Sequence, residues 1–249
     1  IVHFAEAGVV DAEAEADIAL VEGSVSTPEE QARIQAIRSR SRWVVPMGAC
    51  ATAGGPQALR NLADARVWIG SVYPEPQHIQ ALPTADAVAA HVDVELSLPG
   101  CPVSTQQVLD ALATLLAGAS PFAEQDKVCM ECKRRGQVCV LVTRDAPCLG
   151  PVTVTGCGAL CPGLGRACYG CYGPAESPEV ATLAQRFADL GLAPEAVARR
   201  FMFQQSGAEP FQQAAQDWRR RAQEGAAATS ANAPGHADSA ADSAEQGHD

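Results

Sequence analysis

The feature that most constrains this chain is the cysteine-rich segment from Cys129 to Cys171. It holds eight of the ten cysteines of the chain within 43 residues. The eight form two groups of four, each with one C-x2-C pair: Cys129, Cys132, Cys139 and Cys148, then Cys157, Cys161, Cys168 and Cys171. Two cysteines two residues apart in a tight turn direct both sulfur atoms at one centre, and four thiolates complete a closed site. The spacing therefore suits zinc or an iron–sulfur cluster.

Three kinds of chemistry are compatible with these cysteines: disulfide bonds, two structural zinc sites, or two clusters of four irons and four sulfurs. Disulfide frameworks belong to small secreted domains, whereas 249 residues are enough to build a hydrophobic core. Low solvent access helps to set the reduction potential of a cluster. Local composition therefore favours clusters, although a zinc ribbon shares some of these features. The apolar residues around Cys139 are Val138, Val140, Leu141 and Val142.

Glycines recur between the cysteines, where the backbone must turn closely around a metal centre. Glycine adopts conformations that are closed to other residues, so the N–H groups of the chain can point at the sulfur atoms of a cluster. The glycines concerned are Gly136, Gly150, Gly156, Gly158, Gly163, Gly165, Gly170 and Gly173.

The first 120 residues alternate between patterns typical of strands and patterns typical of helices. Short apolar runs predict strands at residues 1–4, 17–22, 42–47 and 93–98. Helices are predicted to begin near Thr27 and to span residues 54–66 and 105–117. Thr27 supplies an N-cap, Pro28 takes the first helical position and Glu30 completes a capping box. This alternation predicts an α/β layer with a parallel sheet.

The two remaining cysteines each follow a predicted strand. Cys50 and Cys101 lie in glycine-containing turns just beyond the ends of those strands. In open parallel sheets, ligands bind in the crevice at the carboxyl ends of the strands. The two residues are therefore candidate ligands of one centre, although buried free thiols are also common in protein cores. Glu22 follows the first of the internal strands and is expected at the same edge, either tuning the site or simply solvated.

Composition excludes several functions for the chain. Its net charge of −11 argues against nucleic acid, whose phosphates require a basic surface. No apolar run approaches the roughly 18 residues of a membrane span. Neither a G-x-G-x-x-G fingerprint nor a P-loop is present, and no Ser/His/Asp or paired-carboxylate arrangement stands out. We therefore expect no catalytic residue in this chain, and we assign neither His78 nor His91 to a metal.

The segment after the cysteines predicts three helices and a tail. The helices are expected at residues 178–190, from residue 194, and at residues 209–223. Residues 225–249 contain no large apolar side chain, so they cannot bury enough surface to offset the entropy of ordering. We therefore expect a disordered tail from Gly225.

Five segments together resemble the small subunit of nickel–iron hydrogenases, within the family of the 20 kDa subunit of NADH:ubiquinone oxidoreductase. The branch most similar is the cytoplasmic NAD(P)-linked kind, the sulfhydrogenase delta subunit. The resemblance extends over residues 17–206. The segments are 21–27 (VEGSVST), 48–51 (GACA), 99–102 (PGCP), 146–153 (APCLGPVT) and 157–174.

The resemblance implies three four-iron clusters in a row. The distal cluster takes Cys129, Cys132, Cys139 and Cys148, with Cys129 in place of a histidine of many relatives. The medial cluster takes Cys157, Cys161, Cys168 and Cys171. Many relatives have proline at the position of Cys161 and carry a three-iron cluster, so the fourth thiolate here implies four irons. The proximal cluster takes Cys50 and Cys101 together with a C-x2-C pair that we expect upstream of residue 1, in a chain that is truncated at its N-terminus.

The resemblance also implies a fold and a function. The fold is a flavodoxin-like parallel sheet with flanking helices over residues 1–120, then a loop-rich iron–sulfur domain with C-terminal helices over residues 121–224, and the tail at 225–249. The function is electron relay in a cytoplasmic hydrogenase. The implied partners are a large subunit with the nickel–iron centre and flavin-, NAD(P)- and ferredoxin-type subunits that bind FAD and NAD(P). Two alternatives remain, a complex I-like quinone-linked assembly and a zinc-stabilised structural subunit.

Overall fold

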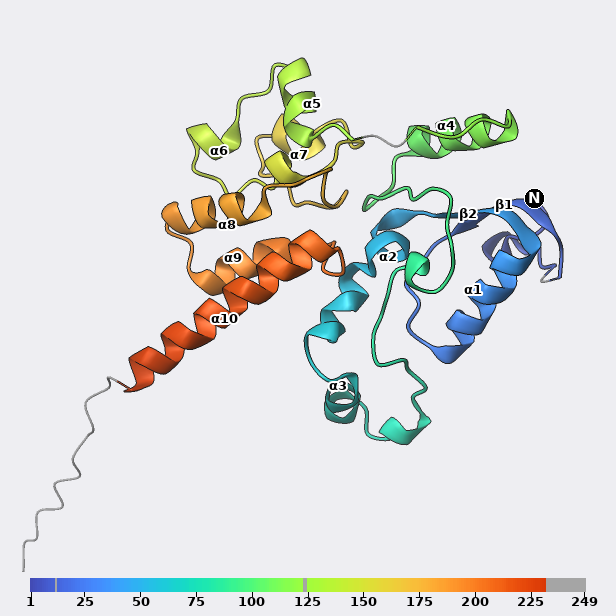
Figure 1. The fold of residues 1–249 in the computed structure, drawn as a ribbon, viewed down its shortest axis with the longest axis horizontal. Helices are drawn as coiled ribbons and strands as arrows, with labels where there is room; N and C mark the ends of the chain where they lie inside the picture. Colours follow the sequence, from blue (N-terminus) through green and yellow to red (C-terminus); the bar gives the residue numbers. More distant parts are fainter. Residues whose placement is uncertain (12, 123–124, 232–249) are drawn as a thin grey trace, which may run out of the picture.

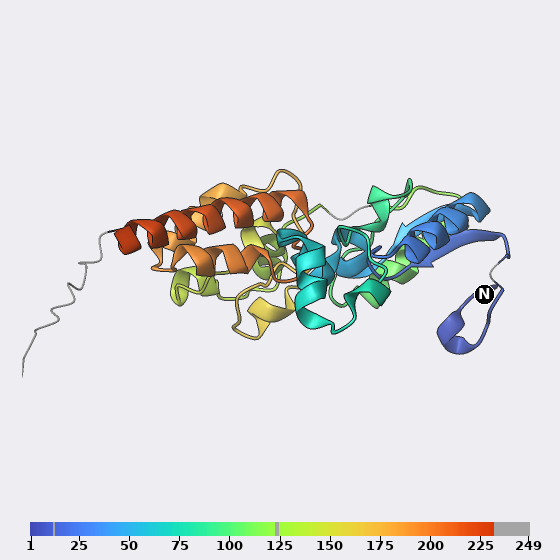
Figure 2. The same cartoon turned by 90° about the horizontal axis from the view of Figure 1, so that it is seen from below.

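A computed structural model describes residues 1–11, 13–122 and 125–231. Figures 1 and 2 show two lobes side by side, joined by the chain after α4. The first lobe contains β1 (Ala16–Val21), α1 (Pro28–Arg40), β2 (Ser41–Pro46), α2 (Gly48–Ala53), α3 (Ala65–Val72), α4 (Thr105–Leu116) and short 3₁₀ helices, η1 (Ala5–Ala7), η2 (Gly55–Leu62), η3 (Pro76–His78) and η4 (Val88–Ala90). The second contains α5 (Val128–Arg134), α6 (Val140–Thr143), η5 (Gly150–Val152), α7 (Leu160–Gly163), α8 (Val180–Asp189), α9 (Pro194–Phe201) and α10 (Glu209–Ala231).

The first lobe is built on the parallel pair β1–β2, which confirms the predicted α/β class. Successive side chains of a strand point to opposite faces, so the neighbours Val44 and Val45 face different layers. Val44 packs in one apolar cluster with Ile34 of α1. Val45 packs in another with Ala111 and Leu115 of α4. The sheet therefore lies between α1 and α4, as Figure 1 shows.

The strand predicted at residues 93–98 is wrong over most of its length. Only Leu98 forms an isolated parallel bridge. The carboxylate of Glu95 accepts the Val44 N–H at 2.7 Å, so a side chain takes the place of regular backbone pairing. The segment still lies beside β2, because the Leu98 N–H donates to the carbonyl of Pro46 at 2.9 Å.

Two further predictions need correction. Residues 1–4 do not form a strand, and Phe4 makes one isolated bridge to Val9. The helix predicted at residues 54–66 is divided into η2 and α3. The division lies at Ala63, whose backbone is extended, and the Asp64 carboxylate then caps a new helix by accepting the Arg66 N–H at 2.8 Å.

The start of α1 confirms the predicted capping box. The Thr27 hydroxyl accepts the Glu30 N–H at 3.2 Å, and the Glu30 carboxylate accepts the Thr27 N–H at 3.0 Å. The same carboxylate accepts from the backbone and the hydroxyl of Ser26. Burial alone raises the pKa of Glu30, but these hydrogen bonds hold its pKa below the usual 4.5.

We expect Thr27→Ala and Glu30→Gln each to lower the free energy of unfolding by about 1 kcal/mol at pH 7. Since the pKa of Glu30 is lowered by folding, its contribution is present above about pH 4.5 and is lost as the pH falls through the lowered pKa. The Glu30→Gln deficit in urea titrations should therefore shrink in acid. Glu29→Gln is the control, since exposed Glu29 pairs only with Arg33 among the described residues. A Glu30→Gln deficit that does not change with pH would contradict this account.

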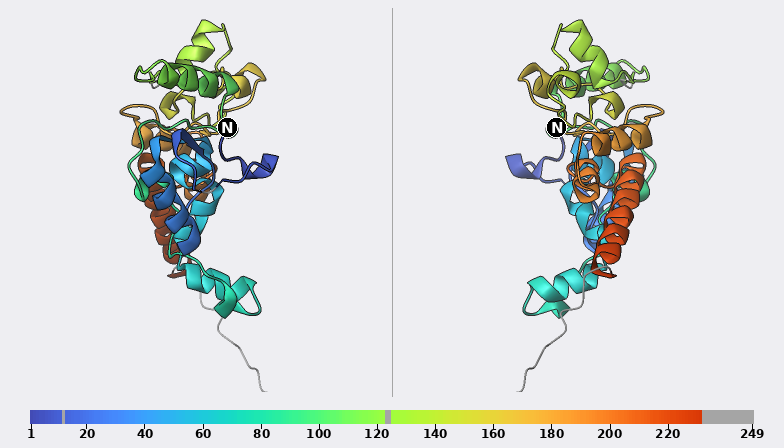
Figure 3. Two further views of the ribbon diagram at one scale, coloured as in Figure 1. Left: turned by 90° about the vertical axis from the view of Figure 1, so that its right-hand side faces the viewer. Right: turned by 90° about the vertical axis from the view of Figure 1, so that its left-hand side faces the viewer.

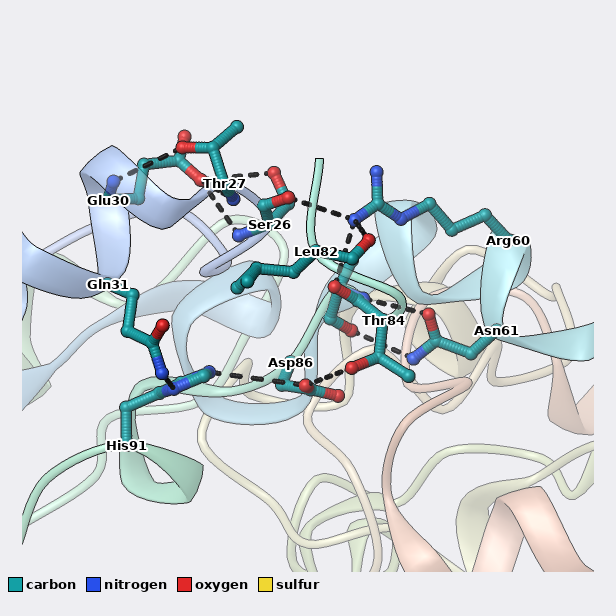
Figure 4. A network of polar contacts seen from close by, with 11 residues as sticks. Ser26, Thr27, Glu30, Gln31, Arg60, Asn61, Leu82, Thr84, Asp86 and His91 are labelled. Carbon is teal, nitrogen blue, oxygen red and sulfur yellow. Dashed lines mark hydrogen bonds and ion pairs between the residues drawn. The ribbon is translucent and has the colours of Figure 1, made fainter. Parts of the chain in front are cut away.

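Polar contacts fix the connection that follows η3, as Figure 4 shows. Asn61 exchanges two hydrogen bonds with the backbone of Ala85, at 2.9 and 2.8 Å. His91, expected on the surface, is mostly buried and contacts Gln31 at 3.3 Å. The connection is therefore held against α1 and η2. The Arg60 guanidinium donates to the carbonyls of Ser26, Leu82 and Thr84.

Three buried phenylalanines form the centre of the second lobe. Phe187 of α8, Phe201 of α9 and Phe211 of α10 are each at most 1% exposed. The ring centroids of Phe187 and Phe201 lie 6.1 Å apart, and those of Phe201 and Phe211 lie 5.8 Å apart. The helices predicted in this region are therefore confirmed, and their apolar faces form one core.

The last helix is longer than predicted. α10 continues to Ala231, so the expectation of disorder from Gly225 is wrong for residues 225–231. Alanine has the highest helix propensity of all residues, and residues 226–228 are alanines. Residues 232–249 of the predicted tail lie outside the described part of the chain. None of the helices in the described residues is both long and apolar enough to cross a bilayer.

Candidate metal centres

Cys50 lies at the carboxyl edge of the sheet, where it was predicted. The Met47 N–H donates to the carbonyl of Val21 at 2.8 Å, which extends the pairing of β2 with β1. The Gly48 N–H donates to the carbonyl of Leu98 at 2.8 Å. The chain then enters α2, so Cys50 lies on a short helix rather than in the predicted open turn.

Cys101 lies beside Cys50 at the same edge. The Ala49 N–H donates to the carbonyl of Gly100 at 2.9 Å, which joins the two cysteine-bearing segments. Burial raises the pKa of Cys50, and the neighbouring Cys101 and Glu22 act in the same direction. The structure therefore brings together all three residues that the sequence placed at this edge.

The backbone packs closely around Cys50. A Cβ atom on Gly55 would lie 2.6 Å from the Cys50 sulfur atom and 2.9 Å from its Cα atom. Gly55 has a positive φ of 57°, which side chains rarely adopt. Only glycine fits at this position, so the sequence leaves the sulfur atom a space that any other residue would fill.

The first group of four cysteines comes together around α5. Cys129 and Cys132 lie on α5, and Cys139 immediately precedes α6. Burial, and then the neighbouring thiols of Cys148, Cys132 and Cys139, raise the pKa of Cys129 to about 11, whereas Lys133 opposes the shift. All three other members are therefore close enough to Cys129 to act on its charge. Within the group, Cys148 is buried and Cys139 is exposed.

The second group comes together in the loops around α7. Burial, and then Cys157, raise the pKa of Cys161, with Arg166 opposing them. Burial is also the main cause that raises the pKa of Cys171 to about 11, with Cys157, Cys161 and Cys101 adding to it. Burial raises the pKa of Cys168 most strongly. Such thiols stay protonated near neutral pH without metal, so metal binding releases their protons.

Backbone donors point at sulfur atoms in both groups. The Cys168 N–H donates to the Cys148 sulfur at 3.2 Å, and the Gly170 N–H donates to the Cys168 sulfur at 3.4 Å. A Cβ atom on Gly150 would lie 3.4 Å from the Cys148 sulfur and 3.5 Å from the Cys129 sulfur. Thiolate ligands, backbone N–H donors and close glycine backbone are the environment that iron–sulfur clusters require, so the residues present fit such a group.

The alternatives left open by the sequence have structural counterparts. All ten cysteines lie within the described residues and all are free, so no pair forms a disulfide. In the described part of the chain, no three His, Cys, Asp or Glu side chains converge closely enough to hold a single metal ion. In a four-iron cluster each thiolate binds its own iron, so such a site does not require convergence on one point.

Tyr172 connects the Cys101 turn to the second cysteine group, a role that no sequence motif indicated. Its ring is 3% exposed and its hydroxyl lies 3.3 Å from the carbonyl of Pro102. A Cβ atom on Gly100 or Gly156 would lie 2.7 or 2.6 Å from the ring. Burial, and then the thiols beside it, raise the pKa of Tyr172 to about 12. Glycines distant in sequence make room for this ring, a relationship visible only in three dimensions.

We expect Tyr172→Ala to lower the free energy of unfolding by about 3–5 kcal/mol, since it removes a buried ring from between two loops. Tyr172→Phe keeps the ring and loses one long hydrogen bond, so its cost should be about 1 kcal/mol or less. Urea titration followed by circular dichroism measures both. Equal costs for the two variants would show that the hydroxyl, rather than the ring, holds the loops.

Comparisons with known proteins now add to this geometry. The family described as NADH ubiquinone oxidoreductase, 20 Kd subunit, matches residues 2–115. The Sulfhydrogenase 2 subunit delta of Pyrococcus furiosus is 36% identical over 187 residues, which cover 74% of this chain and 76% of that protein. A subunit of the F420-non-reducing hydrogenase vhu of Methanococcus voltae is 30% identical over 208 residues, covering 71% and 72% of the two chains.

Solved structures of hydrogenases are also similar to the chain. A chain of an NAD⁺-reducing [NiFe]-hydrogenase in the H2-reduced state is 30% identical with a TM-score of 0.41, and the match covers 44% of this chain and 69% of that one. A chain of the actinobacterial-type NiFe-hydrogenase from Ralstonia eutropha H16 is 18% identical with a TM-score of 0.44, covering 87% and 71%.

The α/β lobe and the cysteine-rich lobe together define a redox protein, a subunit of an oxidoreductase. More particularly, the chain belongs to the family of hydrogenase small subunits, which includes the sulfhydrogenase delta subunit and its counterpart in F420-non-reducing hydrogenase and forms the electron-transfer part of nickel–iron hydrogenases. The family predicted from the sequence motifs is therefore confirmed.

Proposed function

We propose that this chain relays electrons through three four-iron clusters between the nickel–iron centre of a large subunit and a flavin/NAD(P) module. The observation that carries the proposal is the grouping of the cysteines. Each predicted group of four comes together in the second lobe, and Cys50 and Cys101 meet at the sheet edge. An iron–sulfur cluster, when bound, supplies reversible storage of one electron.

In this proposal each group of cysteines holds one cluster. Cys129, Cys132, Cys139 and Cys148 hold the distal cluster, and Cys157, Cys161, Cys168 and Cys171 hold the medial one. Cys50 and Cys101 supply two of the ligands of the proximal cluster. The chain contributes burial and hydrogen bonds. Buried Val128 and Val140 pack in one cluster with Cys148 and Cys168 and exclude water from those sulfur atoms. The backbone N–H of Gly170 offsets negative charge on the Cys168 sulfur.

The partners follow from the same reading. The proximal ligands lie in the first lobe, so this lobe faces the large subunit that splits or makes hydrogen. The medial and distal ligands lie in the second lobe, so this lobe faces the ferredoxin-like and flavin-binding subunits that bind FAD and NAD(P). We place the assembly in the cytoplasm, where the reducing environment keeps ten cysteines free for metal.

Iron, zinc and acid-labile sulfide per chain, measured on protein purified without oxygen, test the proposal. We expect about eight irons and eight sulfides from the two groups of four, and about twelve of each when the native N-terminus completes the proximal site. Cys132→Ser and Cys157→Ser should each remove a different cluster from the electron paramagnetic resonance spectrum. Two zinc ions per chain with no sulfide would overturn the proposal in favour of a structural protein.

A further inference from the structure

The segment around the first two cysteine groups differs in charge from the rest of the chain. Residues 127–166 contain six Lys and Arg against two Asp and Glu, a net charge of +4 in a chain whose total is −11. The remaining residues therefore carry −15. Within the segment, Glu131 pairs with Arg135 at 2.6 Å. Lys133 and Arg166 are exposed and lie close enough to Cys129 and Cys161 to act on their thiols.

The same segment exposes large apolar side chains on its surface. They flank a groove of about 210 Å³ between α6 and α7, which Arg144, Gln137 and Pro162 help to line. The Arg144 guanidinium donates to the carbonyl of Gly165 at 3.0 Å and closes one side of the groove. We name this surface the α6–α7 face. Its exposed apolar residues are Val138 (67%), Val142 (75%), Leu160 (62%) and Leu164 (72%).

The position of the α6–α7 face bears on its role. Cys139 lies within it and is the exposed member of the first group of four cysteines. Figures 1 and 3 show α5, α6 and α7 on the side of the second lobe opposite α10. A centre held by an exposed ligand exchanges electrons with a partner that docks directly over it. This face is therefore the place where a redox partner comes nearest to the first cysteine group.

We propose that the α6–α7 face docks a one-electron redox protein or subunit whose surface around its own centre is acidic. The proposal rests on the proposed function and adds the chemistry of the partner. Charge complementarity selects the occupant, because a basic rim on an acidic chain attracts an acidic partner and repels a basic one. The exposed valines and leucines supply the small apolar contact typical of transient electron-transfer encounters.

Electron transfer across this face is a one-electron step. Hydrogen oxidised at the large subunit supplies two electrons and releases two protons there. Each encounter at the α6–α7 face then oxidises the donor centre by one electron and reduces the docked partner by one electron. No bond forms or breaks at the face, and no proton crosses it.

The test uses the purified hydrogenase complex with three electron acceptors under hydrogen. An acidic plant-type ferredoxin probes the face, a basic c-type cytochrome has the opposite charge, and benzyl viologen needs no docking surface. We expect ferredoxin reduction to slow as ionic strength rises, because salt screens the attraction. The double variant Lys133→Glu/Arg166→Glu should reduce ferredoxin at least about tenfold more slowly and leave viologen reduction unchanged. Arg33→Glu on α1 is the matched control for charge and should match the wild type.

The outcomes separate the inference from the function on which it rests. No hydrogen-dependent viologen reduction by the wild-type complex overturns the proposed function itself. Normal viologen reduction with ferredoxin rates that neither salt nor the double variant changes overturns the docking proposal alone. Equal slowing in Arg33→Glu and the double variant also overturns it, since a general loss of positive charge then explains the effect. Dissociation of the large subunit from the double variant would assign the face to that interface instead.

Discussion

Replacement of Cys161 by proline is expected to convert one four-iron cluster of this chain into a three-iron cluster. A cluster of four irons needs a ligand at each iron, and the second group of cysteines supplies four. Cys161 lies among them, since Cys157 is the neighbouring thiol with the largest effect on its pKa. Without the Cys161 sulfur, one iron has no protein ligand and is lost, while Cys157, Cys168 and Cys171 keep the other three.

The fold is expected to accept this substitution. Cys161 is the second residue of α7, and proline is well tolerated in the first turn of a helix because the N–H groups there have no partner within the helix. Pro162 already follows it, so this turn of the chain accommodates proline. Cys161→Ala serves as a second variant that removes the sulfur without the ring.

The change is measured by iron analysis and electron paramagnetic resonance. We expect both Cys161→Pro and Cys161→Ala to lose about one iron per chain and to gain the signal of an oxidised three-iron cluster close to the free-electron position. Leu160→Ala is the control, since Leu160 is the 62% exposed neighbour and carries no ligand. An unchanged four-iron spectrum in both cysteine variants would show that Cys161 is not a ligand.

The sequence predicted best the features that depend on residues close to one another. The capping box at Thr27 and Glu30 formed as expected because its partners are three residues apart. The apolar runs at β1 and β2 identified strands because burial on both faces requires such runs. The expected meeting of Cys50 and Cys101 followed from a general property of parallel sheets.

The sequence failed where a distant side chain changed the outcome. Glu95 replaces part of the regular pairing beside β2, and a strand-like run does not reveal that its own carboxylate will do so. Tyr172 fits between loops only because Gly100 and Gly156 lack side chains. The contact between the lobes was likewise invisible, since Ser206 and Gly55 are 151 residues apart and neither belongs to a motif.

That contact between the lobes leads to the second large effect, which we expect from Gly207→Ala. A Cβ atom on Gly207 would lie 2.3 Å from the Ala53 carbonyl oxygen and 3.1 Å from its carbon. Both atoms belong to the backbone at the end of α2, so no side chain can move aside. Ser206 fixes the same turn by donating to the carbonyl of Gly55 at 2.9 Å in a buried hydrogen bond. The lobes must therefore separate to admit the methyl group.

The turn that carries Gly207 also holds the second cysteine group. The Gln205 side chain donates to the carbonyl of Cys171 at 2.9 Å, two residues before Gly207 contacts α2. Cys50 lies on α2, so one short turn joins the segments that carry Cys50 and Cys171. Gly207→Ala should therefore lower the free energy of unfolding by about 1–3 kcal/mol or more, and it should also change the separation of the two candidate centres.

Two measurements distinguish the local cost from the change in separation. Urea titration gives the loss of stability, and the magnetic coupling between reduced clusters in the purified complex reports their separation. Gly70→Ala on α3 is the control, since a Cβ atom there has no neighbour within 4 Å and alanine favours the helix. Ser206→Ala should lose about 1–3 kcal/mol by leaving a buried carbonyl unpaired, with little change in the coupling. If Gly207→Ala matches Gly70→Ala in both measurements, the lobes are not held together by this turn, and the spacing of the centres depends on the partner subunits instead.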